Sequence, residues 1–143
     1  MSVMALFGGC KPAVQIPGRE ARMDSYASLV SNLRMRYVPA LLELYSDSVI
    51  TTWGDVAVRG MDDVVKNWQR IVIEARVDQA PRVIVSSTTL GAGMLRDSGT
   101  IVFRIRNAAG GPAFSDSTMR FVTRWVREKK PSRWVIAADS IMP

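Results

Sequence analysis

The sequence predicts an α+β domain in which three N-terminal helices pack into a strongly curved mixed or antiparallel sheet. Apolar residues recur at helical spacing through much of the first half of the chain, whereas from Pro81 onward their period changes to two. The connectors in the second half are short and rich in Gly, Pro, Asp and Lys, which indicates antiparallel strands joined in sequence. A long twisted sheet that curls around helices leaves a cone with an open mouth, so this fold class predicts a pocket.

Two helices are expected before the first strand. Helical periodicity begins near Asp24, a plausible N-cap, and continues to Tyr37. Pro39 interrupts this helix and can occupy the first turn of the next one, residues 40–45. The apolar face of the first helix is formed by Tyr26, Leu29, Val30, Leu33 and Tyr37.

The third helix has the strongest amphipathic pattern in the chain. Gly60 and Asp62 open it, and apolar residues follow at positions i, i+3, i+4 and i+7 between Met61 and Ala75. Before it, residues 46–48 are expected to form a turn, followed by a strand at 49–53 and a short hairpin partner at 56–58. Four longer strands are expected after it, at residues 82–89, 99–107, 117–127 and 134–140.

Length and composition indicate one globular domain. The chain has 143 residues, of which 48% are hydrophobic and 22% charged, values typical of a folded protein. We expect a flexible N-terminal arm at residues 1–21, because Gly and Pro are frequent there, and a single domain at residues 22–143. The net charge of +6 is scattered along the chain without a nucleic-acid-binding motif, so no nucleic-acid partner is expected.

The absence of histidine narrows the possible chemistry. It excludes histidine-based triads and histidine-containing zinc sites, and the single cysteine, Cys10, excludes a four-cysteine metal site. We therefore expect no metal and no cofactor. No apolar run approaches the ~20 residues of a transmembrane helix. A cytoplasmic location is expected, with an exported lipoprotein as the alternative if Cys10 ends a truncated signal.

Asp139 is the most informative single residue, because it lies in an otherwise apolar terminal strand, Arg133 to Pro143. A carboxylate among apolar groups is costly unless it is paired or protonated, and such groups tend to be functional. Three interpretations remain open from the residues: a functional acid, a structural salt bridge and an exposed edge position.

Three strings resemble the NTF2-like (cystatin-like) superfamily, particularly its SnoaL-like, ketosteroid-isomerase-like and limonene-epoxide-hydrolase-like members. They are LLELYSDSVITTWG, VRGMDDVVKNWQ and the closing STMRFVTRWVREKKPSRWVIAADSIMP, and the resemblance covers about residues 24–143. It implies a cone-shaped α+β fold. It does not imply one activity, because the superfamily mixes enzymes with non-catalytic modules.

The resemblance implies that Asp139 matches the last-strand aspartate of the epoxide hydrolases and of the SnoaL-type cyclases. The epoxide hydrolases also have an Arg-x-Asp pair, but the nearest candidate here, Arg104-Ile105-Arg106, lacks the second acid. Strand alternation favours the outer face, opposite Phe103, for both arginines, and the alternative is that Arg104 or Arg106 reaches the pocket. Thr51 and Thr52 stand about where ketosteroid isomerases have their general-base aspartate, so that mechanism is not expected.

Two hypotheses follow for function. In the first, the protein is a cofactor-independent isomerase, cyclase or hydrolase acting on a hydrophobic ligand. Asp139 is its general acid or base and Tyr37 or Tyr45 supplies a hydroxyl donor. In the second, it is a non-catalytic ligand-binding or homodimerisation module that dimerises through the outer sheet face. The candidate ligand-binding residues are Trp53, Trp68, Phe103 and Phe121, and packing in the core is the alternative role for them.

Overall fold

The structure is a computed structural model that describes residues 16–35, 38–129 and 132–143. Two residues singled out from the sequence, Cys10 and Tyr37, lie outside the described residues. The helices are α1 (Arg19–Arg34), α2 (Val38–Leu44) and α3 (Met61–Glu74). The strands are β1 (Tyr45–Trp53), β2 (Val56–Arg59), β3 (Val77–Gln79), β4 (Arg82–Gly91), β5 (Met94–Arg106), β6 (Phe114–Lys129) and β7 (Ser132–Met142).

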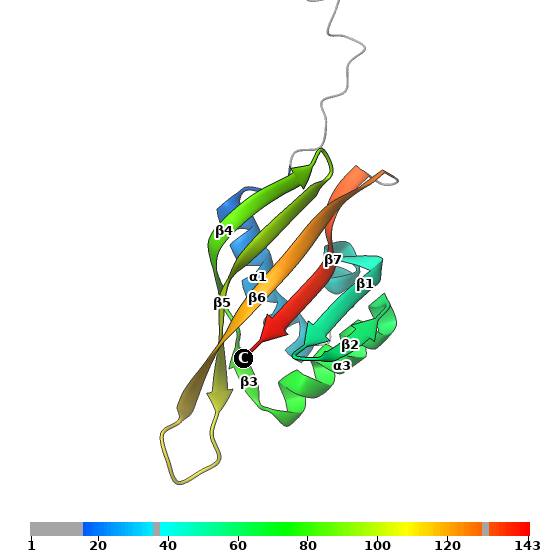
Figure 1. The fold of residues 1–143 in the computed structure, drawn as a ribbon. Coiled ribbons are helices and arrows are strands. Elements are labelled where there is room, and N and C mark those ends of the chain that lie inside the picture. The colour runs from blue at the N-terminus through cyan, green and yellow to red at the C-terminus, as the bar shows by residue number, and fades with distance from the viewer. Residues whose placement is uncertain (1–15, 36–37, 130–131) are drawn as a thin grey trace, which may run out of the picture.

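The seven strands form one sheet in the order β2-β1-β7-β6-β5-β3, and β4 also pairs with β5. β1 pairs with β7 in parallel, while the other pairs are antiparallel, so the sheet is mixed. The three helices lie on one face of this twisted sheet, and the hydrophobic core lies between the helices and the sheet (Figure 1). The predicted α+β architecture with three helices is confirmed.

α1 begins at Arg19, so the predicted start near Asp24 is wrong by five residues and residues 19–21 of the predicted arm are helical. The reason is tertiary. Arg22 is 4% exposed and forms an ion pair with Asp97 of β5, so the first turn of α1 is packed against the sheet. Local capping signals at Asp24 are outweighed by the packing of the first turn.

α3 lies where the sequence predicts it. Gly60, with φ of +88°, precedes the helix in a conformation that favours glycine, and Asp62 and Asp63 interact favourably with the N-terminal dipole. Its apolar face packs into the core between the helix and the sheet. The buried residues of this face are Met61, Val64, Val65, Trp68 and Val72.

Two segments predicted as turns or connectors are strand. β1 already begins at Tyr45, so residues 46–48 lie within it, at an irregularity in its pairing with β7. β5 begins at Met94 and includes Asp97 and Gly99. Glycine is needed at position 99 for a close approach, because a Cβ there would lie 1.9 Å from the carbonyl oxygen of Val83. The same reason explains the irregularity of β4 opposite Gly99, between Ile84 and Ser86.

Candidate functional site

A row of polar side chains crosses the inner face of the sheet. Asp97 of β5 pairs with Thr123 of β6, Thr123 pairs with Asp139 of β7, and Asp139 pairs with Thr51 of β1. Residues directly opposite one another on neighbouring strands project to the same face. All four are at most 1% exposed. These four residues, the polar row, therefore lie inside the cone. They include Asp139, the candidate acid of the sequence.

Asp139 is held by a two-pronged ion pair with Arg82, the first residue of β4. Arg82 Nη1 and Nη2 donate to the two carboxylate oxygens over 2.6 and 2.8 Å. Thr123 Oγ1 donates to Asp139 Oδ1 over 2.8 Å. Both side chains are at most 1% exposed, so the pair is removed from solvent. Of the three interpretations of Asp139, its geometry is that of a buried salt bridge.

The surroundings of Arg82 favour its charged form. Burial alone lowers the pKa of Arg82, but the Asp139 carboxylate more than offsets this effect and raises that pKa above its ordinary value. The guanidinium also lies over the ring of Tyr26, 4.7 Å from its centroid, and over the ring of Phe121 at 5.0 Å. These cation–π contacts stabilise a desolvated cation further.

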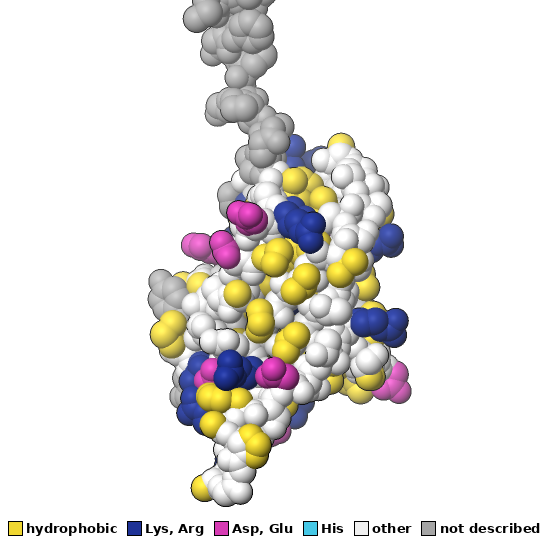
Figure 2. All heavy atoms as spheres, turned by 90° about the vertical axis from the view of Figure 1, so that its left-hand side faces the viewer, with side chains coloured by type: hydrophobic (Ala, Val, Ile, Leu, Met, Phe, Trp, Pro, Cys, Tyr) yellow, Lys and Arg dark blue, Asp and Glu magenta, His cyan; other side chains and the backbone are white. Residues whose placement is uncertain are grey.

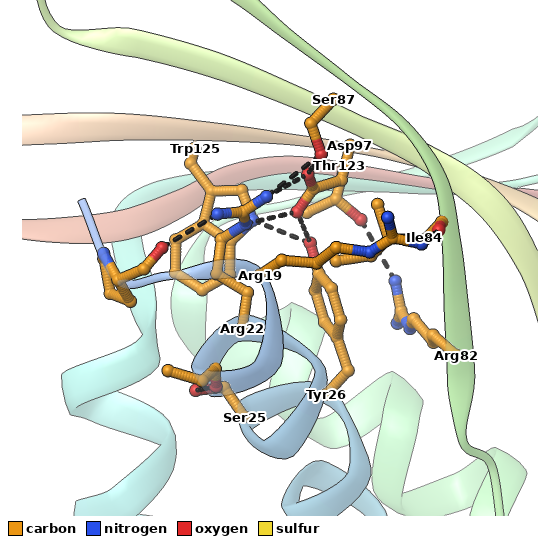
Figure 3. Close-up of polar contacts among 12 residues, drawn as sticks. Arg19, Arg22, Ser25, Tyr26, Arg82, Ile84, Ser87, Asp97, Thr123 and Trp125 are labelled. Carbon is orange, nitrogen blue, oxygen red and sulfur yellow. Dashed lines mark hydrogen bonds and ion pairs between the residues drawn. The ribbon is translucent and has the colours of Figure 1, made fainter.

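A second buried ion pair joins Asp97, at the β5 end of the polar row, to Arg22 of α1 (Figure 3). Arg22 Nε and Nη2 donate to the two oxygens of Asp97, each over 2.8 Å. Asp97 also accepts from Ser87 at 2.7 Å and from the Tyr26 hydroxyl at 2.8 Å. Trp125 Nε1 in turn donates to that hydroxyl over 2.7 Å. Burial alone raises the pKa of Asp97, but the hydrogen bonds from Arg22, Ser87 and Tyr26 outweigh it and lower this pKa.

Tyr26 joins the two ion pairs, because its hydroxyl binds Asp97 while its ring lies against Arg82. Burial, and secondly the charge of Asp97, raise the pKa of Tyr26, so its hydroxyl stays protonated as a donor. The inner face of the cone is thus crossed by a connected polar network rather than by an isolated acid.

Three buried polar atoms beside this network have no hydrogen-bond partner among the residues that the structure describes: Tyr45 Oη, Thr51 Oγ1 and Arg82 Nε. Burial, and secondly the Asp139 charge, raise the pKa of Tyr45, which keeps its hydroxyl neutral. A buried polar atom without a partner costs free energy, and such atoms mark places where water or a ligand can bind.

An apolar hollow of about 120 Å³ lies between the C-terminal half of α3 and the inner face of β1, β5 and β6. Trp53 contributes to its wall and contacts Trp68 edge-on, with centroids 5.0 Å apart, and Phe103 at 5.6 Å. The hollow is lined by Trp53, Ile71, Ala75, Val77, Phe103, Ile105, Ser117 and Met119.

Phe121 separates the apolar hollow from the polar row. On β6 it lies between Thr123, in the row, and Met119, in the hollow wall, and its ring packs against Arg82. It is fully buried. Ligand in the hollow would therefore meet Phe121 before it met Asp139.

Among the candidate ligand-binding residues, Trp53 and Phe103 line the apolar hollow, while Trp68 and Phe121 are buried in the core. Arg104 and Arg106 are both exposed, and Arg106 turns toward Asp78 of β3. Arg104 lies over the ring of Phe114, 4.3 Å from its centroid.

Sequence reasoning missed Arg22, Arg82 and Asp97, although each carries a signal. Arg82 lies two residues from the buried Ile84, so alternation places both side chains on the same face of the strand. Asp97 lies an even number of residues from Leu95, Ile101 and Phe103, which are also buried. Arg22 precedes Tyr26 by one helical turn. A charged residue on the apolar face of a helix or strand is a candidate for a buried ion pair. Two such arginines and two such aspartates, Asp139 included, would have predicted two buried ion pairs.

In the described ranges, no three His, Cys, Asp or Glu side chains are grouped so as to hold a metal ion. Within the same ranges, no helix combines the length and the apolar character needed to cross a membrane.

Comparison with known proteins supports the fold. No protein-family model matches the sequence, and no curated protein matches it. Several solved structures are similar. An NTF2-like superfamily protein from Salmonella enterica serovar Typhimurium has a TM-score of 0.63 at 10% identity, covering 85% of this chain and 87% of its own. An NTF2-like protein from Cytophaga hutchinsonii has a TM-score of 0.60 at 14% identity, covering 89% and 98%.

A third similar structure is a putative calcium/calmodulin dependent protein kinase II association domain from Xanthomonas campestris. Its TM-score is 0.61 at 15% identity, and the match covers 93% of this chain and 96% of that one. At such identities the likeness establishes the fold alone. The chain has the NTF2-like fold, which confirms the fold expected from the sequence.

Proposed function

We propose that this chain, whose fold is that of NTF2-like proteins, binds a small and mainly apolar molecule in the apolar hollow, without catalysis by Asp139. One observation carries the proposal: Arg82 and Thr123 hold both oxygens of a solvent-inaccessible Asp139, whereas the hollow beside Trp53 and Phe103 is open and apolar. A general acid or base must reach the proton that it transfers, and Asp139 is turned instead to its own ion pair.

The hollow limits the size of the ligand. An enclosed apolar cavity of ~150 Å³ in another protein holds benzene, so about 120 Å³ suits a single small ring or a short branched chain. Apolar burial and the π faces of Trp53 and Phe103 would supply the affinity. Trp53 Nε1 is buried without a hydrogen-bond partner, which favours a ligand that carries one acceptor oxygen.

Substitutions on neighbouring residues of β6 test this proposal. Ser117 lines the hollow, whereas Thr118 is exposed on the other face of the same strand. We expect small lactones, which carry an acceptor oxygen, to raise the melting temperature of the wild type and to change its tryptophan fluorescence. Ser117→Leu should abolish both effects, and Thr118→Leu should preserve them. Equal responses of the two variants, or no response of the wild type to any probe, would contradict the proposal.

A catalytic role remains as a second candidate, because Tyr45 Oη, Thr51 Oγ1 and Arg82 Nε lie buried without partners beside Asp139. A substrate or an attacking water that reached these atoms would satisfy them. In that mechanism Tyr45 donates to the developing oxyanion and Asp139 exchanges a proton. Phe121 must move first, because it separates the hollow from the polar row.

Tyr45→Phe is the sharpest test of the catalytic candidate, since it removes an unpaired hydroxyl and leaves the packing intact. The wild type is assayed for turnover of epoxides, lactones and β,γ-unsaturated ketones. Turnover that is lost in Tyr45→Phe supports catalysis at the polar row. Absence of turnover in the wild type supports a binding module, whereas full activity in the variant would exclude Tyr45 from the mechanism.

We further propose that the protein forms a homodimer through the outer sheet face. The helices cover only the inner face, and the outer face carries half-buried Val102 and Val122 and the exposed Val83 and Val85. Figure 2 faces the side of the molecule at which β4 lies, and it shows hydrophobic side chains at the surface on that side. Size-exclusion chromatography with light scattering tests the dimer. Val122→Lys should yield a monomer; an unchanged mass would place any dimer interface elsewhere.

A further inference from the structure

A basic hollow of about 410 Å³ lies where the C-terminal end of α3 meets β3 and the end of β5. This volume falls within the usual range for small-molecule sites. In Figure 2, Lys or Arg side chains gather with Asp or Glu side chains just above the projecting β5–β6 hairpin. The hollow is lined by Arg34, Arg76 and Arg106, by Asp78, and by the apolar Val72, Ile73 and Val77.

Asp78 holds two of the three arginines in place. Arg34 Nη1 and Arg106 Nη2 both donate to its Oδ1, over 3.2 and 3.0 Å. Arg34 Nη1 also reaches the Asp78 carbonyl oxygen at 3.2 Å. A guanidinium has five N–H donors, so most donors of these two side chains are left for another acceptor. The carboxylate thus orients the arginines without saturating them.

Arg76 contributes a third guanidinium, and its backbone has an unfavourable conformation. Its φ is +54°, and in the described part of the chain it is the one non-glycine residue with positive φ. It follows the last turn of α3, a position where glycine is usual because a Cβ is unfavourable there. Among the described residues its side chain has no hydrogen bond or ion pair. Strained residues of this kind are concentrated at functional sites.

We propose that the basic hollow binds a small organic phosphate monoester. The three arginines and Asp78 leave a net charge of +2, which matches a phosphate dianion, and guanidinium groups bind phosphate oxygens two at a time. Ile73 is 58% exposed beside them and offers an apolar surface to the organic part of the ligand. The basic hollow and the apolar hollow share Val77, but none of the three arginines lines the apolar hollow, so the two proposals rest on different residues.

The test is calorimetric titration of the full chain with phenyl phosphate, with phenol and inorganic phosphate as comparison probes. Arg76→Gly is the key variant, since glycine removes a guanidinium and relieves the backbone strain at once. We expect it to raise the melting temperature by about 3 °C while weakening phenyl phosphate binding about tenfold or more. A merely structural arginine would give the first effect without the second.

Arg106→Gln should also weaken binding about tenfold, because it removes one of the oriented guanidinium groups. Arg104→Gln is the matched control: it makes the same change of charge two residues away on β5, outside the hollow. It should leave the affinity within about twofold, the size of a screened surface-charge effect. Three results would overturn the proposal: phenyl phosphate binding no tighter than phenol, affinity unchanged in Arg76→Gly, or an equal loss in Arg104→Gln.

Discussion

Removal of one partner of the Arg82–Asp139 pair is expected to be far more destabilising than removal of both. Asp139→Leu leaves a fully buried guanidinium without a countercharge, and Arg82→Met leaves a buried carboxylate bound to Thr123 alone. Each single variant should lower the free energy of unfolding by roughly 3–5 kcal/mol. That is a large share of the ~5–15 kcal/mol that stabilises a typical domain.

The double variant Arg82→Met/Asp139→Leu contains no buried charge at this place, and its two side chains are apolar and of similar length. It should therefore lie within about 2 kcal/mol of the wild type. The coupling free energy from the four proteins should then be at least ~4 kcal/mol. In thermal unfolding, each single variant should melt roughly 10–20 °C below the wild type, and the double variant much closer to it.

The assay is urea unfolding followed by tryptophan fluorescence and circular dichroism at pH 7. Arg70→Gln is the control, because its ion pair with Glu74 is exposed and is expected to change stability by no more than ~0.5 kcal/mol. Additive single-variant effects would refute the reasoning. They would mean that Arg82 and Asp139 are each solvated independently, and that Asp139 is accessible enough for catalysis.

Other consequences of the polar network are measurable by the same unfolding assay. Tyr26→Phe should cost about 1–3 kcal/mol because Asp97 loses a donor, whereas Tyr45→Phe should be neutral or slightly stabilising because its hydroxyl has no partner; the reverse order would contradict the hydrogen bonding described. Gly99→Ala should cost at least about 3 kcal/mol through its clash with β4, while Gly111→Ala, with open space around it, should change stability by less than ~0.5 kcal/mol. The lowered pKa of Asp97 contributes stability above the unfolded-state value of about 4, which is lost as pH falls through the folded-state pKa. Urea midpoints measured from pH 5 to pH 2 should therefore decline, and decline less steeply in Asp97→Asn.

The elements of regular period were predictable, and the contacts between distant elements were not. The i, i+3, i+4 pattern located α3, and period-two alternation placed Arg104 and Arg106 outside. Asp97 was instead assigned to a connector, and Gly99 was expected only to end that connector and begin the strand at residues 99–107. Its real requirement is the close approach of β4, which only the tertiary structure defines. Local rules assign glycine to turns by default and cannot register contacts across strands.

The identity of Asp139 as an ion-pair member depended on a residue 57 positions away. Its apolar flanks predicted burial correctly, but burial alone does not distinguish a catalytic acid from a paired one. The distinction lies in what contacts the oxygens, and here Arg82 reaches them from β4, a strand that does not pair with β7. An acid in an apolar strand is therefore a reliable sign of a buried partner, and a weaker sign of catalysis.

The connection of the two ion pairs through Tyr26 has a consequence for any ligand that enters the cone. A substrate that displaced Arg82 from Asp139 would also disturb the ring of Tyr26 and, through its hydroxyl, the Arg22–Asp97 pair. Breaking one buried pair costs several kcal/mol, and a coupled network costs more. A small ligand in the apolar hollow gains too little from burial to offset this cost. Ligand binding on the hollow side of Phe121 is therefore compatible with an intact network, whereas catalysis at Asp139 requires a substrate that supplies its own charged partner.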